Sequence, residues 1–215
     1  MTVLALDTTS EYGSLALRSG GNTVAETALH SPGGFGHLIF PAIHNLLSQA
    51  AVRLEKVDCF AAASGPGTFT GVRIGLAAIK GLAEGTGKLA VGVSNLQALA
   101  SFGNLPLRAV ILDARRGAVY AAVYGSDLQP IVPEAVWQLP AWLASLDAPA
   151  YQFISPLARG LLDGTRFAAM PFLIPPASLA AAVGYCAERA TPLDPAALDA
   201  NYVRRSDAEL FWTEP

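Results

Sequence analysis

The sequence predicts an α/β protein in which one structural unit is repeated. Residues 3–7 (VLALD) form a short apolar run that ends in an acid, Asp7, and a small polar turn and a second apolar run follow. Residues 108–124 repeat this order of apolar run, acid (Asp113), polar turn with glycine and apolar run. Each copy is typical of two strands joined by a turn. A duplicated unit of this kind predicts two lobes.

Composition narrows the class of protein. Of the 215 residues, 52% are hydrophobic and 14% are charged, with a formal net charge of −3. The chain has no uncharged apolar run of about 18 residues, the length that a membrane-spanning helix needs, and its first residues lack the features of a signal peptide. We therefore expect a cytoplasmic protein that binds no membrane, whose apolar surface is partly covered by a partner or a second copy. A net negative charge does not favour a surface that binds nucleic acid.

The first lobe is expected over residues 1–103. Apolar runs within residues 3–29 predict three strands, the first two joined as a hairpin. A loop rich in glycine and proline precedes a predicted helix over residues 37–51, and residues 57–63 have the composition of a buried strand. The helix is predicted from apolar residues at helical spacing: Ile39, Ile43, Leu46, Leu47 and Ala50.

A glycine-rich turn, SGPGTFT, leads into a predicted helix over residues 71–83. The N–H groups at the start of a helix suit an anion, but no lysine follows Gly71 as a phosphate loop requires, and the glycine spacing does not fit a dinucleotide loop. Small or apolar residues cover most of this helix. Gly71, Gly75 and Ala78 would let another backbone approach closely, either from this chain or from a partner.

The second lobe is expected over residues 104–215 and is less regular. We expect a short helix with loops over residues 133–146 and a helix over residues 175–190, with Ser178 as its N-cap. Residues 193–215 carry proline and charge and are expected to lie over the fold as a tail. Cys59 and Cys186 have apolar neighbours and are expected to be buried, reduced thiols.

Several segments resemble one family. GPGTFTGVRIG resembles the GPGSFTGLRIG motif of the TsaB family, bacterial relatives of TsaD that help to make threonylcarbamoyl-adenosine in tRNA. LALDTTS, HLIFPAIHNLL, DARRGAVYAAVY and NYVRRSDAE resemble other segments of that family in the same order, with Ala118 where glutamate is common. The resemblance implies the duplicated actin- and hexokinase-like (ASKHA) fold with a reduced second lobe. In active members of that fold, the two acid-bearing loops bracket nucleotide phosphates and metal.

The same resemblance implies that this chain has no catalytic activity of its own. TsaD carries two metal-binding histidines four residues apart, whereas here Pro41 stands at that spacing from His37, and His44 lies too far along the helix. The acid loops would then be degenerate phosphate loops formed by Asp7, Thr8, Thr9 and Asp113. No cofactor or metal is expected, and weak binding of ATP or ADP is left open. The alternative interpretation of these residues is ordinary turn chemistry.

The resemblance also implies partners. We expect a TsaD-like catalytic subunit, which this chain binds and activates, and a TsaE-like ATPase in the same complex, with tRNA contacted only indirectly. Whether the chain alone forms a homodimer is left open. The partner interface is expected on the two helices of the first lobe, at Ile39, Ile43, Leu47, Gly71, Gly75, Ala78, Ile79 and Leu82.

Two other functions are weighed against this one. An independent Mg-ATP-dependent ATPase or kinase would place Asp7 and Asp113 around magnesium, and it would bind nucleotide as an isolated chain. A peptidase would need a Ser-His-Asp grouping or an HExxH motif, and neither is found. Ser64 and Ser94 are expected to be loop or capping residues instead.

Overall fold

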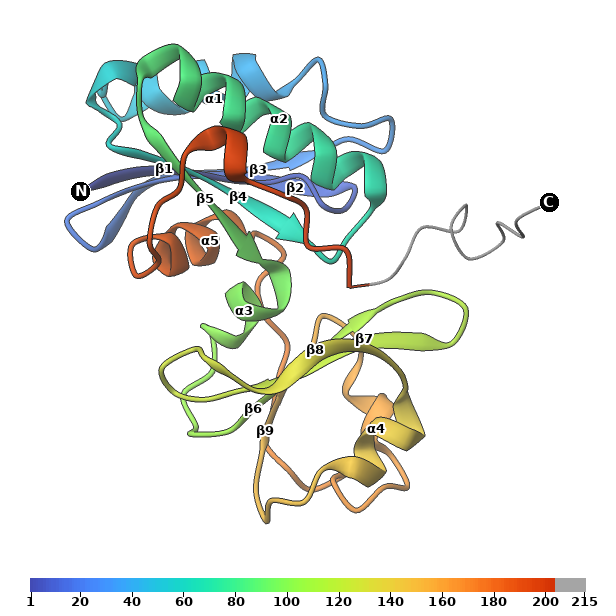
Figure 1. The fold of residues 1–215 in the computed structure, drawn as a ribbon. Coiled ribbons are helices and arrows are strands. Elements are labelled where there is room, and N and C mark those ends of the chain that lie inside the picture. The colour runs from blue at the N-terminus through green and yellow to red at the C-terminus, as the bar shows by residue number, and fades with distance from the viewer. Residues whose placement is uncertain (204–215) are drawn as a thin grey trace.

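The computed structural model describes residues 1–203, which form two lobes, each built on a five-stranded mixed sheet (Figure 1). The first sheet contains β1 (Thr2–Asp7), β2 (Tyr12–Ser19), β3 (Asn22–His30), β4 (Cys59–Gly65) and β5 (Leu89–Ser94). The second contains β6 (Arg108–Asp113), β7 (Ala118–Tyr124), β8 (Pro130–Gln138), β9 (Gln152–Ile154) and β10 (Phe172–Leu173). The α-helices are α1 (Ile39–Gln49), α2 (Phe69–Thr86), α3 (Asn95–Ala100), α4 (Leu139–Ser145) and α5 (Ala180–Ala187). Short 3-10 turns are η1 (Leu54–Lys56), η2 (Arg159–Leu162) and η3 (Pro195–Ala197).

Both sheets follow one plan. The first has the order β3-β2-β1-β4-β5, and the second, taken in the same direction, has the order β8-β7-β6-β9-β10. In each sheet the central strand pairs antiparallel with the strand that follows it and parallel with the fourth strand. Asp7 ends β1 and Asp113 ends β6, so the two acids occupy equivalent positions. The predicted duplication and the two-lobed α/β fold are therefore confirmed.

Helices cover both faces of the first sheet (Figure 1). Strands β1 and β2 alternate their side chains, and one set, which includes Leu4 and Leu15, packs under α1 and α2. The opposite set, which includes Ala5, packs against α5. Because both faces are covered, β1 and β4 read as nearly continuous apolar runs.

A single apolar core joins the two lobes. It contains Ala61 from the first sheet, Leu96 from α3, Val110 and Ile154 from the second sheet and Val183 from α5. On its other face the second sheet is covered by α4 and the turns around it, with Trp142 fully buried. Both α5 and η3 lie beyond residue 103 in sequence, yet they pack against elements of the first sheet. The division of the chain at residue 103 stays a prediction.

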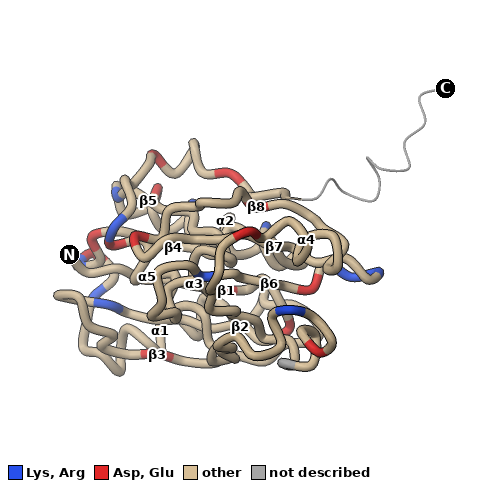
Figure 2. Tube along the Cα trace, turned by 90° about the horizontal axis from the view of Figure 1, so that it is seen from below, with Lys and Arg blue, Asp and Glu red and all other residues tan. Residues whose placement is uncertain are grey.

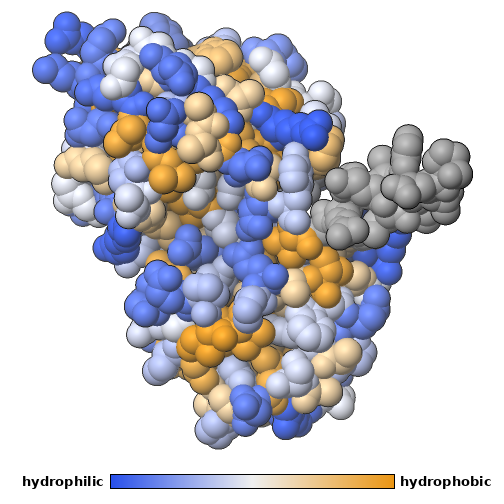
Figure 3. Space-filling view, viewed as in Figure 1, coloured by the Kyte–Doolittle hydropathy of each residue, from blue (hydrophilic) through white to orange (hydrophobic). Residues whose placement is uncertain are grey.

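The surface has few charges. Figure 2 shows positive and negative positions interspersed along the trace, and most of the chain is uncharged. The face in Figure 3 has several separate apolar patches with hydrophilic side chains between them. Among the described residues, no helix is long and apolar enough to cross a membrane.

The structure corrects two predictions about the second half. The short helix with loops predicted over residues 133–146 is present as α4 (Leu139–Ser145), but residues 133–138, expected to be loop, form the end of strand β8. Pairing with β7 decides this, because it places the half-buried Trp137 opposite Val119 and against the core of the second lobe. Ser178 is not the cap of α5, since its hydroxyl bonds Glu26.

A residue from the other half of the chain caps α5 instead. The Ser14 hydroxyl oxygen, on β2, accepts hydrogen bonds from the backbone N–H groups of Leu179 and Ala180, at 3.1 and 2.9 Å. The N-terminal N–H groups of a helix need such an acceptor. This capping contact is long-range, so the local sequence does not reveal it.

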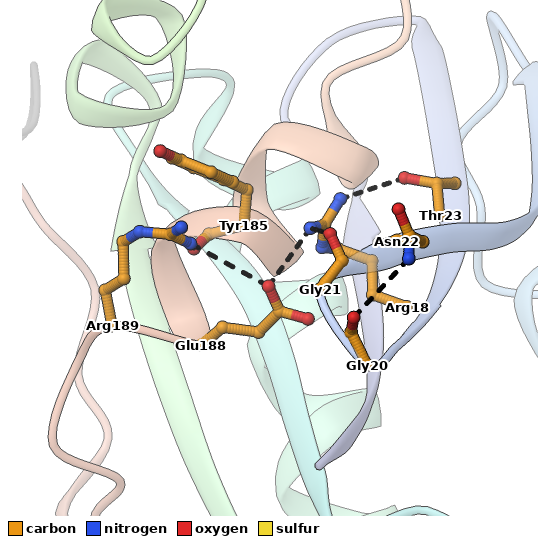
Figure 4. A network of polar contacts seen from close by, with 8 residues as sticks. All are labelled: Arg18, Gly20, Gly21, Asn22, Thr23, Tyr185, Glu188 and Arg189. Carbon is orange, nitrogen blue, oxygen red and sulfur yellow. Dashed lines mark hydrogen bonds and ion pairs between the residues drawn. The ribbon is translucent and has the colours of Figure 1, made fainter.

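A buried ion pair ties the end of α5 to β2 (Figure 4). The Arg18 guanidinium lies 3.0 Å from the Glu188 carboxylate and also donates to Thr23 and to the carbonyl of Gly21. The side chains of Arg18 and Glu188 are 8% and 11% exposed. Gly184 makes room for this arrangement, because a Cβ there would lie 2.6 Å from Cδ of Arg18.

We expect Glu188→Met to lower the free energy of unfolding by about 3–5 kcal/mol, because it leaves the Arg18 charge buried without its partner. Urea unfolding measures this change. The control is Arg189→Met, whose side chain is 53% exposed and whose nitrogen lies 3.8 Å from the same carboxylate; it should change stability by less than about 1 kcal/mol. Equal effects of the two substitutions would contradict a structural role for the buried pair.

Candidate functional site

A cleft of about 880 Å³ lies between the two lobes. The ends of β1 and β6 open into it, and it is lined by Asp7 and Thr9 from the first lobe and by Asp113 from the second. The start of α2, with Thr68 and Phe69, forms another part of its wall. The structure thus brings both predicted acid loops to one cleft, as the duplicated topology requires.

The Asp7 carboxylate is buried and its hydrogen bonds stay within the chain. Its Oδ1 atom accepts from the backbone N–H and the hydroxyl of Thr9, at 2.9 and 2.6 Å. The Thr9 hydroxyl oxygen accepts in turn from the Asn95 side-chain amide at 2.6 Å, and Asn95 Oδ1 accepts from the N–H of Gly65 at 3.1 Å. Burial raises the pKa of Asp7, while the two bonds from Thr9 partly oppose that rise.

The glycines of α2 allow the Asp7 loop to lie directly against the helix. A Cβ on Gly71 would overlap the carbonyl oxygen of Thr8, and one on Gly75 would lie 2.6 Å from the Thr8 hydroxyl oxygen. That hydroxyl donates to the Gly71 carbonyl at 2.7 Å. A Cβ on Gly67 would lie 2.5 Å from Cβ of Thr9. The close backbone approach expected from these small residues occurs, and the backbone that approaches is this chain's own.

Three backbone N–H groups at the Asp7 loop and the start of α2 are engaged within the chain. A phosphate loop presents free backbone N–H groups, but here the N–H of Thr9 donates to Asp7 and that of Thr68 donates to the Thr9 carbonyl at 2.7 Å. The N–H of Gly71 donates to the Thr68 hydroxyl oxygen, which is the N-cap of α2. The N–H groups of Thr9, Thr68 and Gly71 therefore serve the fold.

Asp113 occupies the equivalent position but a different environment. It is exposed, and its Oδ1 atom accepts from the N–H of Arg115 at 2.7 Å. Arg115 and Arg116 have positive φ angles of 62° and 54°, a conformation that is unfavourable for residues with a Cβ. Both arginines line the cleft. The two acids are thus equivalent in topology and different in burial.

Most side chains expected at a partner interface lie inside the protein. Seven of the eight are buried: Ile39, Ile43, Leu47, Gly71, Gly75, Ala78 and Ile79. Leu82 is half-buried and packs against the same core. Their burial leaves these side chains little surface for direct contact with a partner, and the interface expected at these positions stays a prediction. The reason for the burial is that α1 and α2 turn these side chains toward the sheet.

The opposite sides of the same helices are open. On α2, Ala77, Gly81 and Gly85 recur at four-residue spacing and are exposed, and a Cβ added to either glycine would meet nothing within 4 Å. On α1, Phe40 is 53% exposed and His44 lies exposed one turn further on. We call Phe40, His44, Ala77, Gly81 and Gly85 the outer helix face. A glycine in the interior of a helix, such as Gly81, lowers helix stability by about 1 kcal/mol relative to alanine. No contact within the described residues explains why glycine stands at Gly81 or Gly85.

Sequence reasoning missed a polar network that crosses between the lobes. Glu134 on β8 accepts from the Tyr124 hydroxyl and from the Asn201 side-chain amide, the latter at 2.6 Å. The N–H of Asn201 donates to the Ser64 carbonyl at 2.8 Å, so the segment after η3 joins both lobes. These residues are far apart in sequence, and nothing in their spacing indicates that they meet. Arg204 and Arg205, which belong to the predicted tail, lie outside the described residues.

Of the two serines expected to be loop or capping residues, Ser94 caps α3. Ser64 is instead a buried residue of strand β4, so the expectation is wrong for Ser64. Cys59 and Cys186 are buried free thiols, and burial raises their pKa values to about 11 and about 12. His37 and His44 are exposed. Within residues 1–203, no cluster of three or more His, Cys, Asp or Glu side chains could hold a metal ion.

Two sheets of one repeated order, joined by a shared core and separated by a cleft, define a duplicated two-lobed α/β protein. The family profile described as TsaD, tRNA N6-adenosine threonylcarbamoyltransferase, matches residues 35–182. The chain therefore belongs to the TsaD family. YeaZ from Pseudomonas aeruginosa has a similar structure, with a TM-score of 0.79 and 25% identity over 94% of this chain and 99% of that chain.

Two relatives carry the name tRNA threonylcarbamoyladenosine biosynthesis protein TsaB. The Bacillus subtilis protein is 34% identical over 151 residues, which are 68% of this chain and 66% of that protein. The Escherichia coli protein is 37% identical over 131 residues, which are 59% of this chain and 56% of that protein. The matches thus span between about half and two thirds of the length of these relatives. The predicted resemblance to TsaB is confirmed.

Asp7→Asn tests the environment of the buried acid. Because the pKa of Asp7 in the folded chain lies above its ordinary value of 3.8, the folded state retains a proton that the unfolded state releases. The free energy of unfolding therefore falls as the pH rises through this range. Asparagine accepts the same hydrogen bonds without ionising, so we expect the variant to unfold with a higher free energy than the parent near neutral pH and with little difference well below the unfolded-state pKa.

Urea unfolding followed from about pH 3 to about pH 8 measures the difference between the two proteins across the whole window. Asp113→Asn is the matched control, since Asp113 is exposed at the equivalent position. An Asp7→Asn variant that is less stable than the parent at neutral pH would show that the carboxylate is needed in its charged form.

Proposed function

We propose that this chain is an accessory subunit that binds a TsaD-like catalytic subunit during the formation of threonylcarbamoyladenosine in tRNA. Catalysis resides in that partner, and tRNA is contacted only through it. A TsaE-like ATPase belongs to the same complex. The family match and the TsaB relatives support the pathway.

The observation that carries the proposal is the packing of the GPGTFTG segment against the Asp7 loop. The N–H groups of Thr9 and Thr68, which could bind a nucleotide phosphate, are both engaged within the chain. A subunit that acts by binding a partner has no need of this loop as a phosphate site. The outer helix face supports the same proposal, because exposed glycines at helical spacing permit close approach of a second helix.

The second candidate is an independent ATPase or kinase. The cleft favours it, because Asp7 and Asp113 both line this space. The packing of the Asp7 loop favours the accessory role instead. Titration of the isolated chain with Mg-ATP separates the two functions.

The proposal predicts that tRNA threonylcarbamoylation, reconstituted with the partner proteins, falls sharply when this chain is omitted. It further predicts that Gly81→Gln weakens binding to the TsaD-like subunit by about tenfold or more, because a side chain then stands between two closely packed helices. Calorimetric titration of the two proteins measures the affinity. The substitution should not destabilise the chain, since its Cβ meets open space.

Two matched variants control this experiment. Ala141→Gln places the same side chain on an exposed position of α4 in the second lobe and should leave the affinity unchanged. Gly75→Ala alters the buried side of α2 and should destabilise the fold, because its Cβ would lie 2.6 Å from the Thr8 hydroxyl oxygen. Unimpaired modification without the chain, or measurable ATP turnover by the chain alone, would refute the accessory role.

A further inference from the structure

Three side chains form a stacked cluster at the start of α2, which we call the Arg73 cluster. Phe69 and Arg73 come from the first turns of the helix, and Tyr202 comes from the segment that follows η3. The central carbon of the Arg73 guanidinium lies 3.6 Å from the centre of the Phe69 ring. The Phe69 and Tyr202 rings stack with centroids 5.5 Å apart, and Arg73 Nε donates to the Tyr202 hydroxyl at 2.9 Å.

The cluster lies on the surface. Phe69 is 45% exposed and Tyr202 is 46% exposed, and Arg73 is exposed as well. Among residues 1–203, the hydrogen bond of Arg73 is the one made by Nε, and its two Nη groups bond no described residue. The side chain is therefore oriented by a ring and a hydroxyl while its Nη pair remains available to donate.

The segment that carries Tyr202 is itself held in place. The N–H of Asn201 donates to the Ser64 carbonyl at 2.8 Å, and its side-chain amide donates to Glu134 at 2.6 Å. Gly65 permits this contact, because a Cβ there would lie 2.9 Å from the Asn201 carbonyl oxygen. Tyr202 therefore fixes the Arg73 guanidinium from a segment that both lobes hold.

An arginine ordered in this way suits recognition of a planar anion. Two Nη groups in a fixed plane match the two oxygens of a carboxylate. An exposed arginine is normally mobile and loses conformational freedom on binding, but here the stacking restricts it beforehand, which favours affinity. Tyrosine and arginine are also the side chains most often found at the energetic centres of protein interfaces.

We propose that Arg73 is an anchor that binds a carboxylate on the protein partner of this chain. The inference rests on the proposed function, because Arg73 precedes Ala77 and Gly81 at four-residue spacing and so extends the outer helix face. A phosphate of tRNA would offer similar chemistry. Three features favour a protein over tRNA as the group that Arg73 binds. The chain has a net negative charge, small apolar residues follow Arg73 on the helix, and Glu84 is exposed further along it.

Calorimetric titration of the full chain with the TsaD-like subunit tests the anchor. Arg73→Gln and Arg73→Lys should each weaken binding by about tenfold or more, since lysine keeps the charge but lacks the planar pair of donors. Tyr202→Phe keeps the stacking and removes only the hydroxyl that orients Nε, and it should give a smaller loss. Arg53→Gln, at an exposed position outside α1 and α2, is the matched control and should bind like the parent.

The outcomes separate this inference from the proposed function. If the parent chain does not bind the TsaD-like subunit, the proposed function fails. If the parent binds and both Arg73 variants bind within about twofold of it, the anchor is wrong and the proposed function stands. If Arg73→Gln abolishes binding of the chain to tRNA and leaves the protein affinity unchanged, the group bound is a phosphate and the carboxylate proposal is overturned. Urea unfolding of each variant verifies that it is folded.

Discussion

The contact between Thr8 and the first turns of α2 sets the geometry of the first lobe. It requires two positions without a Cβ, Gly71 and Gly75, and it brings the end of β1 within hydrogen-bonding distance of the helix. Because α2 lies this close, the N–H of Thr68 donates to the Thr9 carbonyl, and Asp7 and Thr9 are largely buried where they line the cleft. The acid of the first lobe is therefore packed into the cleft wall, whereas Asp113 of the second lobe is exposed.

This contact also gives α2 two different faces. The inward face carries the glycines that the fold needs, and its packing extends through Ile79 to the sheet. The outer face has glycines that the described fold does not need, at Gly81 and Gly85. Residues of one type on one helix thus have two separate physical roles, and only the outer set is available for a partner. The proposed accessory role depends on this separation.

The second lobe is joined to the first by contacts that depend on the end of the chain. Helix α5 completes the first lobe through the Arg18–Glu188 pair and the Ser14 cap. The following segment then reaches the second sheet at Glu134 and the start of α2 at Arg73. One stretch of backbone therefore connects the cleft, the second lobe and the outer helix face. A partner that binds Arg73 would therefore contact a side chain whose position depends on the cleft, the second lobe and the outer helix face together.

The sequence by itself determined the duplicated plan, the position of the acids at the ends of β1 and β6, and the location of α1 and α2. These features follow from apolar periodicity, glycine turns and the repeated strand–acid–strand order, all of which are local. The sequence did not determine β8, which forms by pairing with β7, or the cap of α5, which comes from Ser14. It also could not decide which glycines of α2 face inward, because that depends on where Thr8 lies. The tertiary structure alone decided the different burial of Asp7 and Asp113 and the formation of the Arg73 cluster, since both arise between residues that are distant in sequence and meet only when the lobes are packed.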